Sequence, residues 1–309
     1  MDILNVTNLS KSFSKKQVIK NISFNVKQGE IIGFVGPNGA GKTTTIKLIT
    51  NLIYPDSGQI SINGYNLFAD RANALSNIAA IIENPGLYTY LTGRDNLEFI
   101  RRMRNCSRER MNSIIEHIGL SDRIDDTVKN YSLGMKQRLA LGMCLLPAPK
   151  LLILDEPTNG LDPDGTIEFR NMIINLAKKE KTSVLFSSHL LSEVERVCDR
   201  IIFIKDGKIV SILDKSTLRD NQLYKLSVGN AEEAYSALIK SDKVLSASVA
   251  GDNEILLNIK AKAIEDILKL LTEKNITFTD INRIEIDLET EYIKIFEEST
   301  NKNGKPDCF

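Results

Sequence analysis

One eight-residue segment has the spacing of a phosphate-binding loop. Residues 36–43 read Gly-Pro-Asn-Gly-Ala-Gly-Lys-Thr and fit the pattern G-x-x-x-x-G-K-[ST] at every required position. An apolar run precedes the loop and a helix-compatible segment follows it, which disfavours the alternative of a chance glycine-rich turn. Glycines let backbone N–H groups point at phosphate oxygens, and the start of the helix adds partial positive charge. The predicted nucleotide contacts are Gly36, Asn38, Gly39, Ala40, Gly41, Lys42, Thr43 and Thr44.

Within this loop, two side chains have distinct predicted roles. Lys42 would reach the β- and γ-phosphates of a nucleotide, and the Thr43 hydroxyl would bind Mg²⁺. A second apolar run, about 110 residues further on, ends in two carboxylates, Asp155 and Glu156. Unpaired charges at the end of a buried strand are costly, so a purely structural role for these two carboxylates is disfavoured and a functional role is predicted. Asp155 suits a water-mediated contact to Mg²⁺, and Glu156 suits polarising the attacking water.

The elements that must position these residues alternate along about the first 215 residues. Consecutive apolar positions predict strands buried on both faces of a mostly parallel sheet, at 31–35, 151–154, 183–186 and 201–204. Residues 4–8 and 59–63 predict antiparallel strands instead. Helical patterns between about 85 and 145 predict a helical subdomain. The fold class is therefore α/β, a P-loop NTPase core with antiparallel β and helical subdomains.

A smaller C-terminal module is predicted at 216–298. Strands and amphipathic helices follow in the order β-α-β-β-α-β, which is that of a ferredoxin-like α+β module. Its helices are expected at 231–240 and 263–272, with a closing helix at 288–298. The polar residues 299–309 are expected to form a disordered tail. Because it contains no catalytic cluster, the sequence assigns this module no definite role, and a dimerisation appendage, a regulatory appendage and a surface cap all stay open.

Composition limits the possible partners. Lysine plus arginine equals aspartate plus glutamate at 40 each, which predicts no bulk attraction to nucleic acid. The four cysteines have neither paired nor metal-ligand spacing, as expected of free thiols in a reducing cytoplasm. The N-terminus lacks a signal-peptide pattern, and no apolar run approaches the ~20 residues needed to cross a bilayer. Any membrane span must therefore belong to a partner.

Further motifs make the chain resemble the ATP-binding subunits of ABC transporters. Residues 131–138, Tyr-Ser-Leu-Gly-Met-Lys-Gln-Arg, resemble the signature motif of that family. Residues 158–163 resemble its D-loop, and His189 after two serines resembles its switch histidine. Phe13 occupies the place of the aromatic residue that stacks on adenine, although an aromatic near a strand end often only packs. The resemblance covers about residues 2–215.

This resemblance implies a dimer with shared nucleotide sites. Two subunits would pair head to tail, so that Ser132 and Gly134 of one face the γ-phosphate held by Lys42 of the other. His189 would hold the γ-phosphate and the water in line with Glu156. A lone histidine after an apolar strand is ordinarily structural, but the order of the motifs favours catalysis. ATP and Mg²⁺ are the implied cofactors, and homodimer and heterodimer both stay open.

Two positions depart from the usual family pattern. The signature normally reads L-S-G-G-Q, and three of those five residues are replaced here while the serine and the second glycine remain. Nucleotide binding should survive this change. Glu83 stands where the family usually has a glutamine that touches Mg²⁺ and senses the membrane subunit. Glu83 is therefore a predicted metal ligand; the alternative is a residue that caps a surface turn before Pro85.

A carboxylate at this point resembles the subgroup of ABC ATPases that protect bacteria from bacitracin and lantibiotic peptides. Residues 287–293 resemble the ending of ATPases paired with drug- and peptide-exporting permeases. The resemblance implies ATP hydrolysis coupled to export through a separate permease of the ABC-2 type, at the inner face of the cell membrane.

Two other functions are less consistent with the sequence. A soluble ABC ATPase acting in translation or DNA maintenance is disfavoured because the chain has no second nucleotide domain, coiled-coil insertion or basic patch. A nucleotide-dependent regulatory module is disfavoured by Glu156, since a pure switch needs no catalytic carboxylate. No nucleic-acid partner is expected.

Overall fold

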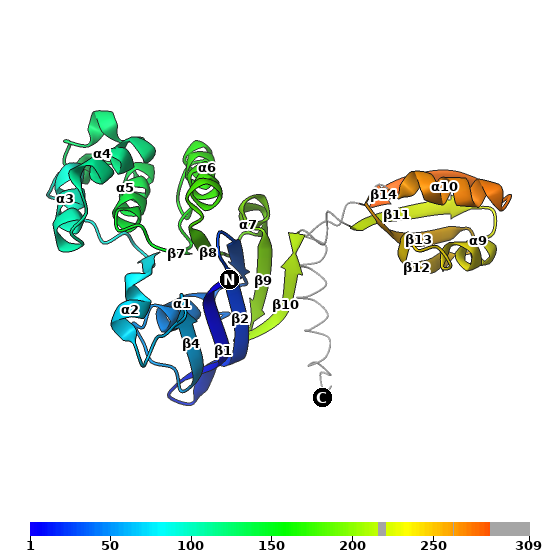
Figure 1. Cartoon of the computed structure of the whole chain (residues 1–309), viewed down its shortest axis with the longest axis horizontal. Helices are drawn as coiled ribbons and strands as arrows, with labels where there is room; N and C mark the ends of the chain where they lie inside the picture. Colours follow the sequence, from blue (N-terminus) through cyan, green and yellow to red (C-terminus); the bar gives the residue numbers. More distant parts are fainter. Residues whose placement is uncertain (216–220, 262, 285–309) are drawn as a thin grey trace, which may run out of the picture. The chain divides into compact units, whose positions relative to one another are not determined.

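A computed structural model describes residues 1–215, 221–261 and 263–284 of the chain (Figure 1). The predicted closing helix at 288–298 and the predicted tail at 299–309 lie outside the described residues. The chain divides into two compact units, an N-terminal unit (Met1–Leu213) and a C-terminal unit (Asp214–Phe309). Each unit has its own hydrophobic core.

The N-terminal unit is built around a six-stranded sheet. Its strand order is β10-β9-β3-β8-β7-β6, and the neighbours from β9 to β6 pair in parallel. The four apolar runs predicted as buried strands are β3, β7, β8 and β9, and every residue of β3, β7 and β8 is buried. The strands are β3 (Ile31–Val35), β6 (Ile78–Ile81), β7 (Leu151–Asp155), β8 (Ser183–Ser188), β9 (Arg200–Lys205) and β10 (Lys208–Asp214).

A second sheet of four strands has the order β2-β1-β4-β5. β1 (Asp2–Phe13) pairs antiparallel with both β2 (Lys16–Lys27) and β4 (Ser57–Ile62), and β5 (Tyr65–Asn66) follows at the edge. The two predicted antiparallel strands are thus direct neighbours, with Leu4 opposite Ile62. This sheet confirms the antiparallel β subdomain.

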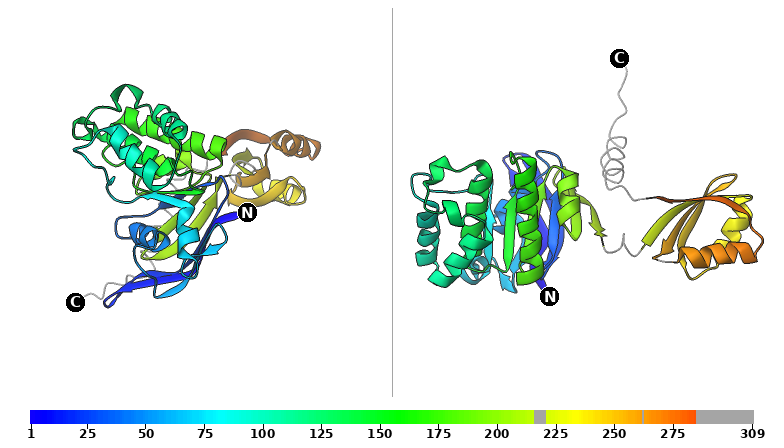
Figure 2. Two further views of the ribbon diagram at one scale, coloured as in Figure 1. Left: turned by 60° about the vertical axis from the view of Figure 1, so that its left-hand side comes forward. Right: turned by 90° about the horizontal axis from the view of Figure 1, so that it is seen from above.

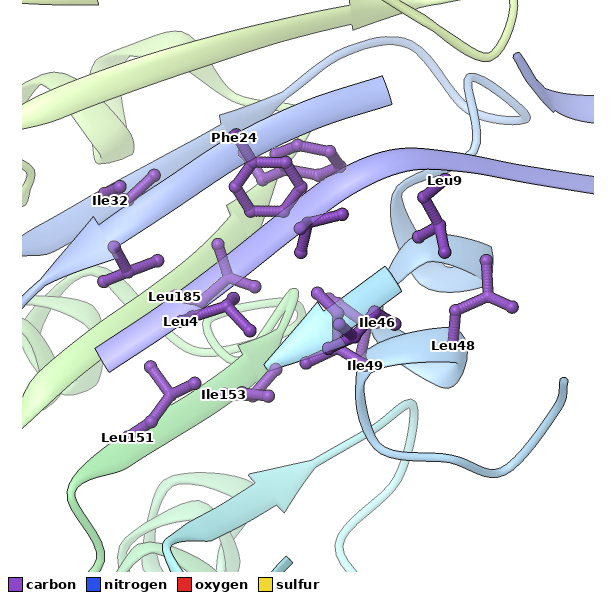
Figure 3. Packing of buried hydrophobic residues seen from close by; sticks show 14 of the residues in the cluster. Leu4, Leu9, Phe24, Ile32, Ile46, Leu48, Ile49, Leu151, Ile153 and Leu185 are labelled. Carbon is purple, nitrogen blue, oxygen red and sulfur yellow. The ribbon is translucent and has the colours of Figure 1, made fainter. Parts of the chain in front are cut away.

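The core of this unit lies between the two sheets and includes helix α1 (Lys42–Ile49). This helix contributes Ile46, Leu48 and Ile49, which have no exposed surface. Figure 3 shows them beside side chains from both sheets, including Leu4 of β1 and Ile153 of β7. Because the first residues of α1 also belong to the phosphate-binding loop, the core fixes the position of that loop.

The remaining helices of the unit include the predicted helical subdomain. α3 (Gly93–Met103), α4 (Arg108–His117) and α5 (Leu133–Leu145) stand together as a group beside the sheets (Figures 1 and 2). Short polar residues start each of them: Thr92, Ser107 and Ser132 accept a backbone N–H in the first turn. The other elements are α2 (Arg71–Ser76), η1 (Ser121–Arg123), η2 (Val128–Asn130), α6 (Pro163–Glu180) and α7 (Leu191–Val197).

The C-terminal unit has the predicted β-α-β-β-α-β order over its described residues. Its antiparallel sheet has the order β12-β13-β11-β14, so the first and third strands are central, as in a ferredoxin-like module. Buried residues of both helices and of the strands form one core. The elements are β11 (Asn221–Val228), α9 (Ala231–Leu238), β12 (Val244–Gly251), β13 (Glu254–Lys260), α10 (Ile264–Glu273) and β14 (Phe278–Ile284).

Candidate nucleotide site

The candidate site lies at the carboxyl ends of three adjacent strands. β3 leads into the phosphate-binding loop, β7 ends in Asp155 and is followed by Glu156, and β8 leads to His189. The strands end at the same level, since Val35 pairs with Ser188 and Asp155 pairs with Ser187. Parallel order alone therefore brings three motifs, which are far apart in the sequence, to one edge of the sheet.

Two glycines fix the shape of the phosphate-binding loop. Gly36 has no room for a side chain, because a Cβ there would lie 2.2 Å from the carbonyl oxygen of Ile204. Gly41 caps α1 with a φ of 111°, a conformation that favours glycine. Since this cap offers no side-chain hydrogen bond, the N–H groups of the first turn are available to an anion. The loop thus fits nucleotide phosphates.

The ammonium group of Lys42 is buried beneath this loop. Its side chain is only 5% exposed, and Nζ donates to the carbonyl oxygen of Gly36 at 2.7 Å. Nζ also lies 3.2 Å from Oε1 of Glu156, on the neighbouring motif. A buried cation with one carboxylate partner is suited to binding a second anionic group such as a phosphate.

Glu156 is in direct contact with both of the other predicted catalytic residues. Besides Lys42, it contacts His189, whose Nδ1 lies 2.9 Å from Oε2, and Asn159, whose Nδ2 donates to the same oxygen at 2.6 Å. Burial acts to raise the pKa of Glu156, but the hydrogen bonds from Asn159, Lys42 and His189 outweigh it and hold the pKa below its usual value of 4.5. Glu156 is therefore ionised at neutral pH, as polarisation of a water molecule requires.

Ser187 contacts both of the acidic residues at the end of β7 and just after it. Its Oγ donates to Oδ1 of Asp155 at 2.6 Å, and the backbone N–H of Glu156 donates to the same Oγ at 3.0 Å. Glu156 has a φ of 46°, which is uncommon for a residue other than glycine. A second bond, from its N–H to the carbonyl oxygen of Ser187 at 3.1 Å, helps to hold that conformation. Ser187 thereby orients the side chain of Asp155 and holds the backbone of Glu156.

Sequence reasoning did not assign roles to three residues at this edge. Asn159 and Ser187 were parts of motifs only, and Glu193 was not singled out at all. Glu193 of α7 accepts hydrogen bonds from Thr158 and from Ser188, which ties the loop after β7 to the end of β8. The sequence feature that could have indicated Asn159 is its position three residues after Glu156 in a turn. No feature of the sequence indicates the role of Glu193.

Ser132 and Gly134 lie in a different part of the unit. Ser132 caps α5, where its Oγ accepts the N–H of Met135 at 3.2 Å. Both residues line a hollow of about 360 Å³ together with Gly160 and Leu161 of the D-loop. The signature motif and the D-loop thus form a second surface with its own polar groups.

Phe13 ends β1 with its ring 46% exposed. The Nζ atom of Lys11 lies 5.5 Å from the centre of this ring and is also 3.0 Å from Oδ1 of Asp56. A ring that is half exposed and flanked by a cation has surface left for a flat aromatic group.

Glu83 lies past the edge strand of the parallel sheet. Ile81 of β6 pairs with Leu154 of β7, so Glu83 follows the same sheet edge as Asp155. Its Oε1 lies 2.7 Å from Nζ of Lys47 on α1, and its side chain is 60% exposed. The structure therefore places Glu83 in an ion pair with Lys47 of α1. Lys47 lies four residues after the predicted ligand Thr43.

The donor set suits a magnesium ion that is shared with a nucleotide. In the described ranges, no group of three or more histidine, cysteine, aspartate or glutamate side chains could hold a metal alone. Mg²⁺ is usually bound by one or two protein side chains plus waters and substrate phosphates. Thr43 and Asp155, at the same sheet edge as the loop, fit that arrangement.

A phosphate-binding loop joined through one carboxylate to a histidine is the arrangement of a P-loop nucleotide hydrolase. Comparison with known proteins defines the class further. The family described as ABC transporter matches residues 19–159. The bacitracin transport ATP-binding protein BcrA of Bacillus licheniformis is 36% identical over 95% of this chain and 97% of its own. The lantibiotic transport ATP-binding protein SrtF of Streptococcus pyogenes is 42% identical over 67% of this chain and 89% of its own.

A solved structure of the ATP-binding subunit of an ABC transporter is also similar. It is 32% identical, covers 70% of this chain and 92% of its own, and has a TM-score of 0.64. The chain belongs to the ABC transporter family, as an ATP-binding subunit. It is an ATPase whose cofactors are ATP and Mg²⁺. A role in translation or DNA maintenance is not favoured by such relatives.

No helix among the described residues combines the length and the apolar character that a membrane crossing requires.

Proposed function

We propose that this protein powers the export of a peptide antibiotic, of the bacitracin or lantibiotic kind, through a separate permease of the ABC-2 type. The observation that carries the proposal is the similarity to the bacitracin transport protein, which extends over 296 residues and so includes the C-terminal unit. Glu83, in place of the usual glutamine, supports the same subgroup. The ATPase would act at the inner face of the cell membrane.

Hydrolysis would use the residues that meet at the sheet edge. Lys42 and the first turn of α1 bind the phosphates, while Glu156 polarises the attacking water and His189 keeps that water in line. When bound by Thr43 and Asp155, Mg²⁺ would supply positive charge that neutralises the phosphate oxygens. A phosphate at Lys42 would replace Glu156 as its anionic partner and so release the carboxylate toward the water.

The second polar surface supports a head-to-tail dimer. Ser132 and Gly134 form part of a hollow at the start of α5, a helix that directs partial positive charge toward it. A γ-phosphate held by Lys42 of a second subunit would complete this hollow. ATP would then join two subunits, which are either identical or different, and hydrolysis would separate them.

A largely apolar hollow supports docking of a permease segment. Its volume is about 530 Å³, and it is lined by residues that directly follow Glu83 and by side chains of α3 and α5, among them Leu87, Ile100, Met103 and Met143. The exposed aromatic rings of Tyr88 and Phe99 lie nearby in edge contact with each other. A helix of the permease with an apolar face would bury this surface.

The proposal is tested in cells that express this protein together with candidate permease genes from the same genome. We expect wild type to raise the inhibitory concentration of bacitracin or of a lantibiotic, and not that of a small non-peptide drug. The Glu156→Gln variant should give no protection, whereas Glu180→Gln, an exposed change at the end of α6, should protect like wild type. Active ATPase with unchanged peptide susceptibility would contradict the proposed substrate class.

A further inference from the structure

One ion pair links the loop after β6 to the helix of the phosphate-binding loop. Glu83 and Lys47 are 36 residues apart in sequence, yet Oε1 of the glutamate accepts from Nζ of the lysine at 2.7 Å. Lys47 stands four residues after Thr43 in α1, and residues four apart lie on the same side of a helix. The ammonium group is therefore above the same face of α1 that presents the predicted magnesium ligand.

The charges at this edge of the sheet explain why such a partner is needed. Three carboxylates follow neighbouring strands: Glu83 after β6, and Asp155 and Glu156 at the end of β7. Lys42 contacts Glu156 at 3.2 Å, and Lys47 contacts Glu83. A glutamine at position 83 would be neutral, whereas an unpaired glutamate would add a full negative charge beside a triphosphate.

We propose that Lys47 is a positioning residue that lets Glu83 serve in place of a glutamine. Lys47 neutralises the carboxylate and holds Oε1, so that the pair presents Oε2 toward the nucleotide with the net charge of an amide. The hydrogen bond from Lys47 engages Oε1 of Glu83, so Oε2 can serve for the contact with the nucleotide. The inference rests on the predicted role of Glu83 toward Mg²⁺.

A purely structural role of this ion pair would affect stability and not nucleotide affinity. The lysine side chain is 34% exposed and the glutamate 60% exposed, and ion pairs that are so exposed contribute little to stability. Loss of Lys47 should therefore leave the thermal midpoint of the nucleotide-free protein near that of wild type. Its effect should be seen in the affinity for nucleotide, and only when Mg²⁺ is present.

The test is a double-mutant cycle on the full chain with Lys47→Met, Glu83→Gln and the double variant. Equilibrium binding of a fluorescent ATP analogue is measured with Mg²⁺ and with EDTA. In the wild-type background, Lys47→Met should weaken Mg²⁺-dependent binding by about threefold to tenfold more than it does in the Glu83→Gln background, which is the coupling expected of contacting groups. Lys47→Arg, which keeps the charge, should restore most of the affinity.

Lys179→Met, an exposed lysine on α6, serves as the matched control and should bind like wild type. Equal losses from Lys47→Met in both backgrounds would overturn the proposal, because the two residues would then act independently. Equal losses with Mg²⁺ and with EDTA would also overturn it, since Lys47 would then act on the phosphates directly. The exporter proposal is judged separately by peptide susceptibility, so either inference can fail alone.

Discussion

Replacing Glu156 by glutamine removes one charge from the centre of the site. Glutamine has the same shape, so its amide oxygen can still accept from Lys42, and the unusual backbone conformation at this position is unaffected. Without a carboxylate to polarise water, turnover should fall by roughly 10²-fold or more, which corresponds to about 2.7 kcal/mol of transition-state stabilisation.

The same change should tighten ATP binding, because Glu156 and phosphate compete for Lys42. Two unit charges 3.2 Å apart interact by about 5 kcal/mol at an effective dielectric constant of about 20. Glutamine keeps a hydrogen bond to Lys42 and the Glu156 side chain is 21% exposed, so only a fraction of that energy is at stake. We expect a gain of roughly 1 kcal/mol, or about fivefold in affinity.

Three measurements together test this reasoning: steady-state ATPase rate, equilibrium binding of ATP, and sedimentation with ATP and Mg²⁺. The variant should hydrolyse slowly, bind ATP more tightly and sediment as a stable dimer, since closure persists without hydrolysis. The Glu180→Gln control should match wild type in all three. Turnover at the wild-type rate would refute the catalytic role of Glu156, and weaker ATP binding would refute the competition for Lys42.

Three further outcomes are expected. Ser132→Arg should abolish ATPase activity while leaving the nucleotide affinity of the monomer nearly intact. If binding and turnover assays show that affinity and activity are lost in parallel, the whole site lies within one subunit. Truncation after Lys215 should leave a monodisperse unit that binds ATP, because that unit has its own core; size-exclusion chromatography shows whether it aggregates instead. Glu98, hydrogen-bonded to two arginines, has its pKa lowered to about 2. Its ion pairs should therefore persist below pH 4.5 and be lost only as the pH falls through about 2, which a carboxyl NMR titration of Glu98 checks; a midpoint near 4.5 would contradict it.

Sequence was sufficient for those features that depend on local pattern. Consecutive apolar residues predicted β3, β7 and β8 because strands buried on both faces need no polar alternation. The C-terminal unit was predicted in its β-α-β-β-α-β order because its helices show clear amphipathic spacing. Chemical roles for Lys42 and Asp155 followed from motifs placed at the ends of predicted strands.

The contacts between motifs could not be derived in this way. Asn159 reaches Glu156 only because the chain turns sharply after β7, with a left-handed residue at position 156. Ser187 contacts the Asp155 carboxylate and the Glu156 backbone because β8 is the direct neighbour of β7. The Lys47–Glu83 pair requires the edge position of β6. Such pairings depend on strand order, which no local pattern contains.

The position of β3 between β8 and β9 also affects how the protein is made. The phosphate-binding loop is complete at Thr43, but both strands that flank β3 are synthesised later, and β9 ends at Lys205. At 5–20 residues per second, the ribosome needs roughly 8 to 30 s to add the intervening residues. Until β8 is complete at Ser188 the apolar strand Ile31–Val35 lacks both of its neighbours, and until β9 is complete it lacks one of them. The nascent chain therefore has a period in which an apolar strand that is fully buried in the finished protein is exposed.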